Sequence, residues 1–344
     1  MRIVVIGGTQ FIGLALVKHL TEQGHEVTVF HRGETEPPDL PAVAHIHGDL
    51  DHLADFSPMW THLAPDVVVH MMLGMEAQAQ EALRALRGAT RRLVAISSMD
   101  VYRAYGRINR IEPGPPDPVP LTEDAPLRDH LYPYRGKVDH LHDYDKILVE
   151  RVVLGDPDLP GTVLRLPMVH GPRDYQHRLF PYLKRMDDGR PSIVLDEDRA
   201  RMRATRGYVE NVAVAIALAV TDERASGRIY NVGEEQALTE AEWVHAIGRA
   251  AGWTGEVVVV PRERLPRALR WWGDANMEQD WAVDTTRIRA ELGYTELVPR
   301  AEALRRTVAW ARVNPPTDIP PTLLDYAAED AVLASGVCKI FISY

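Results

Sequence analysis

Short apolar runs alternate with longer amphipathic segments through the first half of the chain. The runs are rich in β-branched residues and lack polar alternation, which is typical of parallel strands covered on both faces. They predict strands at Ile3–Ile6, Val27–Phe30, Val67–His70, Leu93–Ile96 and Thr162–Leu166. Helical patterns lie between them, at Phe11–Gln23, Glu76–Arg87 and Tyr144–Leu154. This alternation predicts an α/β fold built on a doubly wound parallel sheet.

The second half of the chain is less regular and predicts a smaller mixed α/β lobe. Helices are expected at Val209–Val220, Glu240–Ala251, Thr285–Leu292 and Ala301–Arg312, with strands near Ile229–Val232 and Val257–Val260. We therefore expect residues 1–166 to form the sheet domain, residues near 206–232 to return to it, and residues 167–313 to form most of the second lobe. Residues 103–135 predict a long surface loop. Residues 314–344 begin in a proline-rich stretch and predict an extended tail.

Composition narrows the class of protein. The 344 residues carry a formal net charge of −10, which disfavours nucleic acid as a partner because phosphate binding needs positive charge. No apolar run is long enough to span a bilayer, and the apolar stretch after Met1 is too short for a signal peptide. The single cysteine, Cys338, excludes an internal disulfide framework. These features predict a cytoplasmic protein, and they leave a small-molecule substrate and a homodimer possible.

A glycine-containing segment follows the first predicted strand and opens the first predicted helix. Glycines in this context permit a tight turn and close packing of the helix on the strand, and the helix N-terminus attracts a pyrophosphate. The position of the segment therefore predicts a Rossmann-type dinucleotide site. Its cofactor-binding residues are expected to be Gly7, Thr9, Gln10, Phe11, Ile12 and Gly13.

The chain resembles the extended short-chain dehydrogenase/reductase superfamily, which includes the NAD-dependent epimerase/dehydratase family. Gln10 stands where that family has its middle glycine, and this turn is more similar to an atypical branch that includes chloroplast stem-loop RNA-binding proteins. The resemblance implies that Asp49 and Leu50 contact adenine. It rests on segments that occur in the family's order: Gly7–Gly13, Gly48–Leu50, Asp66–His70, Arg165–Pro172, Arg206–Val209, Tyr230–Gly233 and Asp284–Tyr294.

The end of the second predicted strand bears on the choice of cofactor. An NAD-specific site usually offers an acidic residue there to the ribose hydroxyls. His31 and Arg32 occupy these positions instead, and Arg32 could pair with a 2′-phosphate. We therefore expect NADP(H) to be preferred, with NAD(H) as a possible cofactor.

Two catalytic residues follow from the resemblance. The segment from Ser97 to Tyr102 resembles the family's Ser-Ser-x-x-Val-Tyr, which makes Ser98 the catalytic serine. Lys146 matches the lysine that binds the nicotinamide ribose and lowers the pKa of a tyrosine placed four residues earlier on the same helix face.

The acid/base residue is left open, because the expected tyrosine position holds His142. Tyr144 lies two residues before Lys146, about 200° away on a regular helix, and could serve if the helix starts irregularly. One alternative is His142 itself, whose imidazole titrates near neutrality without help from a lysine. The phenols of Tyr102, Tyr132 and Tyr134 are further alternatives, since they could approach from nearby loops.

Further residues are candidates for substrate or metal binding. Tyr102 is expected at the substrate, and Arg203 or Arg206 could grip a phosphate or carboxylate through a bidentate guanidinium. His45 and His47 share a strand face, but the resemblance gives nearby Asp49 to adenine, so we expect no metal site.

The function expected from these residues is that of an NAD(P)-dependent enzyme. It would act as an epimerase, dehydratase or reductase on a sugar-like alcohol or ketone, including nucleotide-sugars. The alternative is a dinucleotide-binding regulator or RNA-binding relative without redox activity, which Gln10 and the missing Tyr-x-x-x-Lys motivate.

Overall fold

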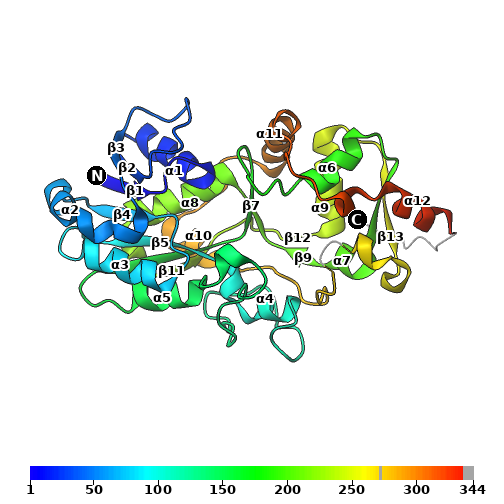
Figure 1. Ribbon diagram of the computed structural model, residues 1–344, viewed down its shortest axis with the longest axis horizontal. Helices are drawn as coiled ribbons and strands as arrows, with labels where there is room; N and C mark the ends of the chain where they lie inside the picture. Colours follow the sequence, from blue (N-terminus) through cyan, green and yellow to red (C-terminus); the bar gives the residue numbers. More distant parts are fainter. Residues whose placement is uncertain (271–272, 336–344) are drawn as a thin grey trace.

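The computed structural model describes residues 1–270 and 273–335. Its larger lobe is a seven-stranded sheet in the order β11-β6-β5-β4-β1-β2-β3, and every neighbouring pair is parallel (Figure 1). The prediction of a Rossmann-type doubly wound sheet is confirmed. The strands are β1 (Arg2–Ile6), β2 (Glu26–His31), β3 (Ala44–His47), β4 (Val67–His70), β5 (Leu93–Ser98), β6 (Gly161–Leu166) and β11 (Ile229–Asn231).

Helices cover both faces of this sheet, which explains why its strands are uniformly apolar. In β1, Ile3 and Val5 enter the core on one face, whereas Val4 and Ile6 enter the core on the other. The first face packs against α1 (Phe11–Glu22) and α8 (Val209–Thr221), with α10 (Thr286–Leu292) beside them. The second packs against α2 (Ser57–Leu63), α3 (Glu76–Leu86) and α5 (Lys146–Leu154). The segment 103–135, expected to be a loop, also contains α4 (Arg103–Ile108).

The smaller lobe lies beyond the carboxyl ends of the strands (Figure 1). Three short two-stranded sheets run through it: β7 (Met168–His170) with β10 (Arg206–Tyr208), β9 (Arg203–Ala204) with β12 (Leu238–Thr239), and β8 (Ser192–Asp196) with β13 (Glu256–Val260). Its helices are α6 (Phe180–Asp187), α7 (Glu197–Arg201), α9 (Glu240–Ala251), α11 (Arg300–Val313) and α12 (Tyr326–Ala334).

The structure corrects the expectation that residues 314–344 form an extended tail. Residues 326–334 are helical, and Arg185 and Glu329 form a buried ion pair that fastens this helix to α6. The prolines at positions 315, 316, 320 and 321 favoured an extended chain, so the sequence did not predict the short helix that follows them. Residues 336–344 lie outside the described part of the chain.

A buried ion pair between Arg165 and Glu150 joins strand β6 to helix α5. Arg165 on β6 donates two hydrogen bonds to Glu150 on α5, at 2.7 and 2.9 Å, and both side chains are almost fully buried. Glu150 also accepts a hydrogen bond of 2.6 Å from Ser97 on β5. Arg165 donates further bonds to the hydroxyl of Tyr102 and to the carbonyl oxygen of Glu123. The network therefore joins β5, β6, α5 and the loop after α4.

We predict that Glu150→Ala lowers the free energy of unfolding by about 3–5 kcal/mol, because it leaves the Arg165 guanidinium buried without its counter-charge. Glu223→Ala is the control, since Glu223 forms an exposed pair with Arg91 and its loss should change stability by less than about 1 kcal/mol. Urea denaturation of both variants measures the difference. If the two substitutions lowered the free energy of unfolding equally, the buried pair would not stabilise the fold more than the exposed pair, contrary to this prediction.

Candidate functional site

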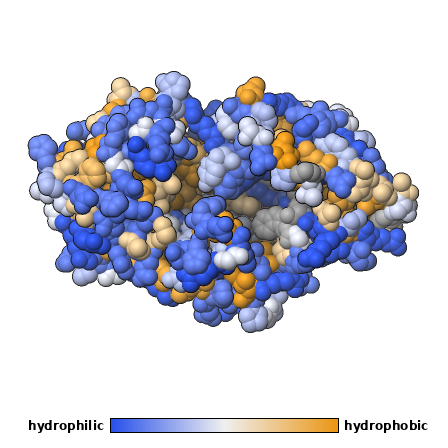
Figure 2. Space-filling view, in the orientation of Figure 1, coloured by the Kyte–Doolittle hydropathy of each residue, from blue (hydrophilic) through white to orange (hydrophobic). Residues whose placement is uncertain are grey.

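A cleft of about 720 Å³ lies at the carboxyl ends of the strands. Figure 2 shows the surface hollowed between the two lobes. The carboxyl edge of a doubly wound sheet is where ligands bind in such folds. Nine of the ten residues predicted to bind cofactor line this cleft: Gly7, Thr9, Gln10, Phe11, Ile12, Gly13, Arg32, Asp49 and Leu50.

The glycines of the first turn bring helix α1 against the end of strand β1. Gly7 has a φ of +87°, a conformation that glycine adopts without strain. A Cβ on Gly13 would overlap the carbonyl oxygen of Gly7, so only glycine permits this approach. The N-terminus of α1 consequently faces the cleft, where a pyrophosphate would meet unpaired backbone N–H groups. Gln10 turns its side-chain amide to the hydroxyl of Thr35, 3.2 Å away.

The wall of the cleft just after β2 carries one positive and one negative side chain. Arg32 is exposed and pairs with Glu34 at 2.8 Å, and both residues line the cleft. The sequence reading considered only residues 31 and 32 at this point. The structure shows that an acidic side chain also reaches the cleft, from two residues further along the loop.

The start of helix α5 places Tyr144 and Lys146 in a relation that a continuous helix would not give. Asp145 is the N-cap residue, with an extended backbone, and its carboxylate accepts the N–H of Ile147 at 2.9 Å. Tyr144 therefore precedes the helix, and the 200° separation expected on a regular helix does not apply. The Lys146 ammonium lies 5.6 Å from the centre of the Tyr144 ring.

Lys146 is anchored inside the sheet end. Its ammonium donates to the carbonyl oxygens of Ile96, at 2.8 Å, and Leu73. Burial lowers the pKa of Lys146 to about 8, although Asp100 opposes this change. The residue does not line the open cleft, unlike the other nine predicted cofactor contacts.

Asp100 is a residue of the site that the sequence reading did not select. It follows β5 and accepts hydrogen bonds from the hydroxyls of Tyr144, at 3.0 Å, and Tyr134, at 3.1 Å. Tyr105 donates in turn to Tyr134 at 2.9 Å. Burial raises the pKa of Asp100, and burial together with the Asp100 charge raises that of Tyr144 well above its usual value. Tyr144 is therefore a neutral phenol held against a carboxylate.

A second cavity of about 650 Å³ opens between the lobes beside this cluster. It shares five lining residues with the first cleft, Ser98, Leu166, Pro167, Tyr175 and Arg178, so the two spaces adjoin there. Tyr144 lines the second cavity together with Ser98. The polar and aromatic residues of the second cavity include Asp100, Tyr105, Tyr134, Tyr144, His170, Tyr182, Arg199, Arg206, Glu240, Trp243 and Trp281.

Besides Lys146, three predicted site residues lie apart from both cavities. His142 is exposed and contacts Asp143 at 3.0 Å. Tyr102 is fully buried, and its hydroxyl donates to Asn231 at 2.6 Å within the ion-pair network. Arg203 is half-exposed and donates to the carbonyl oxygen of Ala237. Arg206, by contrast, lines the second cavity, so the structure places only one of the three expected substrate contacts there.

The signals that would have found the additional residues are weak in sequence. Asp100 stands inside the recognised segment after β5, but its burial depends on the distant residues 128–146. Tyr134 lies in the loop whose path the hydrophobic pattern does not specify.

Residues 3–233 match the model of the NAD dependent epimerase/dehydratase family. The chain belongs to this family. Relatives of the chain include epimerases, dehydratases and reductases.

Two relatives and one solved structure illustrate the range of proteins to which this chain is similar. The chain is 25% identical to the chloroplast stem-loop binding protein of 41 kDa b from Arabidopsis thaliana, over 75% of the chain and 65% of that protein. It is 27% identical to the 3-diazoavenalumate denitrifying reductase of a Streptomyces species, over 87% of the chain and 97% of the relative. The Bordetella bronchiseptica enzyme WbmG, solved with NAD and UDP, has a similar fold, with a TM-score of 0.67 and 20% identity over 91% and 95% of the two chains.

No helix in the described part of the chain is both long and apolar enough to cross a membrane.

We predict that Gly13→Ala weakens dinucleotide binding at least tenfold, because the added methyl group must push α1 away from the Gly7 carbonyl. Ala15→Ser, on the same helix, should bind normally. Calorimetric titration with NAD and NADP measures both variants, after circular dichroism has shown that each is folded. Unchanged affinity of the folded Gly13→Ala protein for both dinucleotides would contradict the assignment of the cleft as the dinucleotide site.

Proposed function

We propose that the protein is an NAD(P)-dependent enzyme that oxidises or reduces a hydroxyl-bearing carbon of a nucleotide-sugar-like substrate. One observation carries the proposal: the glycine-lined cleft and the polar second cavity adjoin along shared residues that include Ser98, and Tyr144 lines the second cavity together with Ser98. A dinucleotide in the first space and a substrate in the second would be in contact at these two hydroxyls. The nicotinamide ring, when bound, supplies the acceptor or donor of a hydride.

The single cysteine supports a reducing, cytoplasmic environment.

Tyr144 is our candidate for the acid/base. Its oxygen would take the proton of the substrate hydroxyl while its own proton passes to Asp100, 3.0 Å away. The raised pKa of Asp100 suits that carboxylate to accept a proton from a phenol. Ser98 would hold the substrate oxygen, and the buried Lys146 ammonium would balance the negative charge near Tyr144.

The second cavity suits a substrate with a phosphate group. Arg199 and Arg206 both pair with the single carboxylate of Glu240, so the three side chains carry one net positive charge. Burial alone would raise the pKa of Glu240, but the two guanidinium groups lower it to about 2 and keep it ionised. Arg206 also stacks on the ring of Trp243 at 4.5 Å. Guanidinium groups held in this way favour phosphate oxygens, as in a nucleoside diphosphate.

The preference for NADP(H) over NAD(H) is also part of the proposal. Arg32 lines the cleft just after β2, where its guanidinium would pair with an adenosine 2′-phosphate. Glu34 competes with that phosphate for the same guanidinium.

We predict that Tyr144→Phe lowers the turnover number by about 10²–10⁴-fold, the range that a positioned acid/base contributes. His142→Ala should leave turnover unchanged, because His142 lies outside both cavities. The assay offers UDP- and dTDP-hexoses with NAD or NADP, and follows both the sugar product and the absorbance of reduced cofactor. Full activity in Tyr144→Phe protein that still binds dinucleotide would contradict the assignment. Failure of the unmodified protein to convert any such sugar would contradict the substrate class.

We predict that Arg32→Ala weakens NADPH binding and leaves NADH binding unchanged, since only NADPH carries the 2′-phosphate. Glu34→Gln should strengthen NADPH binding, because it releases Arg32 from its present partner. Calorimetry with both cofactors on the two variants measures this. Equal affinity of the unmodified protein for the two cofactors would contradict the preference.

A further inference from the structure

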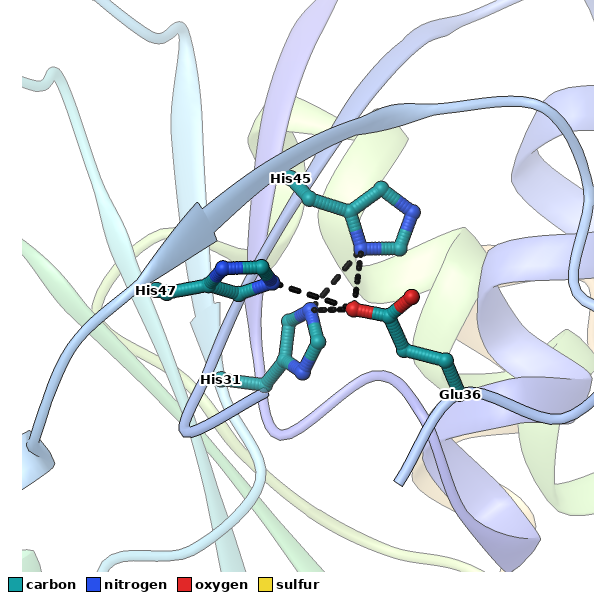
Figure 3. Close-up of side chains that lie close together, drawn as sticks. All are labelled: His31, Glu36, His45 and His47. Atoms are coloured by element: carbon teal, nitrogen blue, oxygen red, sulfur yellow. Dashed lines mark hydrogen bonds and ion pairs between the residues drawn. The ribbon is translucent and has the colours of Figure 1, made fainter. Parts of the chain in front are cut away.

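Three histidines and one glutamate converge at the edge of the sheet, beside the dinucleotide cleft, which His31 also lines (Figure 3). His31 ends β2, and His45 and His47 lie on the edge strand β3. The two β3 residues are two positions apart and so point to one face. In the parallel register His31 is opposite His47, which brings its ring to the same face. Glu36 approaches from the loop that follows β2.

The separations between the ligand atoms match a tetrahedral metal site. The Glu36 carboxylate oxygen Oε1 lies 3.0 Å from His47 Nε2, 3.5 Å from His31 Nε2 and 3.7 Å from His45 Nδ1, and the last two nitrogens are 2.8 Å apart. Bond lengths of about 2.0–2.1 Å to a tetrahedral Zn²⁺ require ligand atoms about 3.3 Å apart, so the observed values lie on both sides of the requirement. In residues 1–270 and 273–335 this is the one group of three or more such side chains whose ligand atoms all lie within 4.8 Å of one another.

We propose that His31, Glu36, His45 and His47 bind one divalent transition-metal ion of the zinc class at the end of strands β2 and β3. Imidazole nitrogens select zinc, cobalt, nickel or copper, whereas magnesium and calcium require sets of oxygen ligands. With a dipositive ion, the three neutral imidazoles and one carboxylate leave a single positive charge. His47 and Glu36 are about half exposed, which gives the ion a path from solvent.

The imidazoles must change partners when the ion binds. Without metal, His31 and His45 share one proton between their facing nitrogens, and the N–H of Gly33 donates to His31 Nδ1 at 3.2 Å. Metal at His31 Nε2 moves the proton of that ring to Nδ1, so the Gly33 amide must turn away. Gly33 lies in an exposed loop at a φ of +81°, where a glycine can rotate with little steric resistance. Burial, with the charges of the two neighbouring histidines, lowers the pKa of His31 and favours the neutral ring that a metal needs.

The site would clamp the loop between β2 and β3. Residues 32–35 lie between His31 and Glu36, and three of them, Arg32, Glu34 and Thr35, line the dinucleotide cleft. A metal ion would join both ends of this four-residue segment to β3. Metal binding can be measured without an activity assay. The outcome of that measurement therefore does not depend on whether the proposed enzymatic reaction is correct.

The test is a titration of the chelator-treated full-length protein with Zn²⁺. We expect one ion per chain, and at least about 100-fold weaker binding in His45→Ala and in His47→Ala, because even groups that only support a ligand contribute 10–100-fold. Both residues lie at the sheet edge, so these variants should fold. Glu36→Gln keeps the shape of the side chain, removes its charge and should also weaken binding.

His52→Ala is the matched control, since His52 is exposed nearby on the chain and does not belong to the group. It should bind zinc like the unmodified protein. Replacing zinc with Co²⁺ should give the intense visible absorption of a tetrahedral ion, and that absorption should be lost in His45→Ala. The proposal is overturned if zinc binds equally to the His45→Ala, His47→Ala and His52→Ala variants, if no zinc binds, or if Mg²⁺ binds as tightly as Zn²⁺.

Discussion

The buried pair between Arg165 and Glu150 is the constraint on which the geometry of the site depends. Glu150 lies one turn beyond Lys146 on the same helix, and its other partner, Ser97, is the neighbour of Ser98. The strand that carries the serine and the helix that carries the lysine are therefore fixed to each other through one carboxylate. Neither charge can leave this interior without its partner, because an isolated buried charge is strongly unfavourable. The candidate reacting groups thus stand on rigid elements, although the cavity they face lies between two lobes.

Much of the sheet domain was predictable because its signals are local. Apolar runs covered on both faces gave the strands β1, β4 and β6 within a residue or two, and the glycines after β1 marked the first turn. Helix α9 was predicted with its correct bounds, since Thr239 and Glu242 form a capping box and Gly252 ends the helix. Strand β3 was not among the predicted strands of the sheet, although His45 and His47 were expected to share a strand face, because its exposed face is polar and its place in the sheet depends on pairing with β2.

The site was less predictable, because it depends on distances that no local pattern encodes. The choice between Tyr144 and His142 stayed open while a continuous helix was assumed. The extended N-cap at Asp145 changes the direction of Tyr144, whereas the His142 side chain lies in solvent. The histidine group shows the same limit. The sequence showed that His45 and His47 share a face, but His31 joins them only through the register of two strands.

The second cavity has an optical property that follows from its walls. Trp243 and Trp281 are both buried, and both line it. Indole emission responds to the polarity and the charges around the ring, and Arg206 already lies against one of the two rings. Anything that fills the cavity must displace solvent beside these indoles or move that guanidinium. The chain thus contains an intrinsic fluorophore pair that reports occupancy without a label, and it does so even for compounds that the protein binds but does not transform.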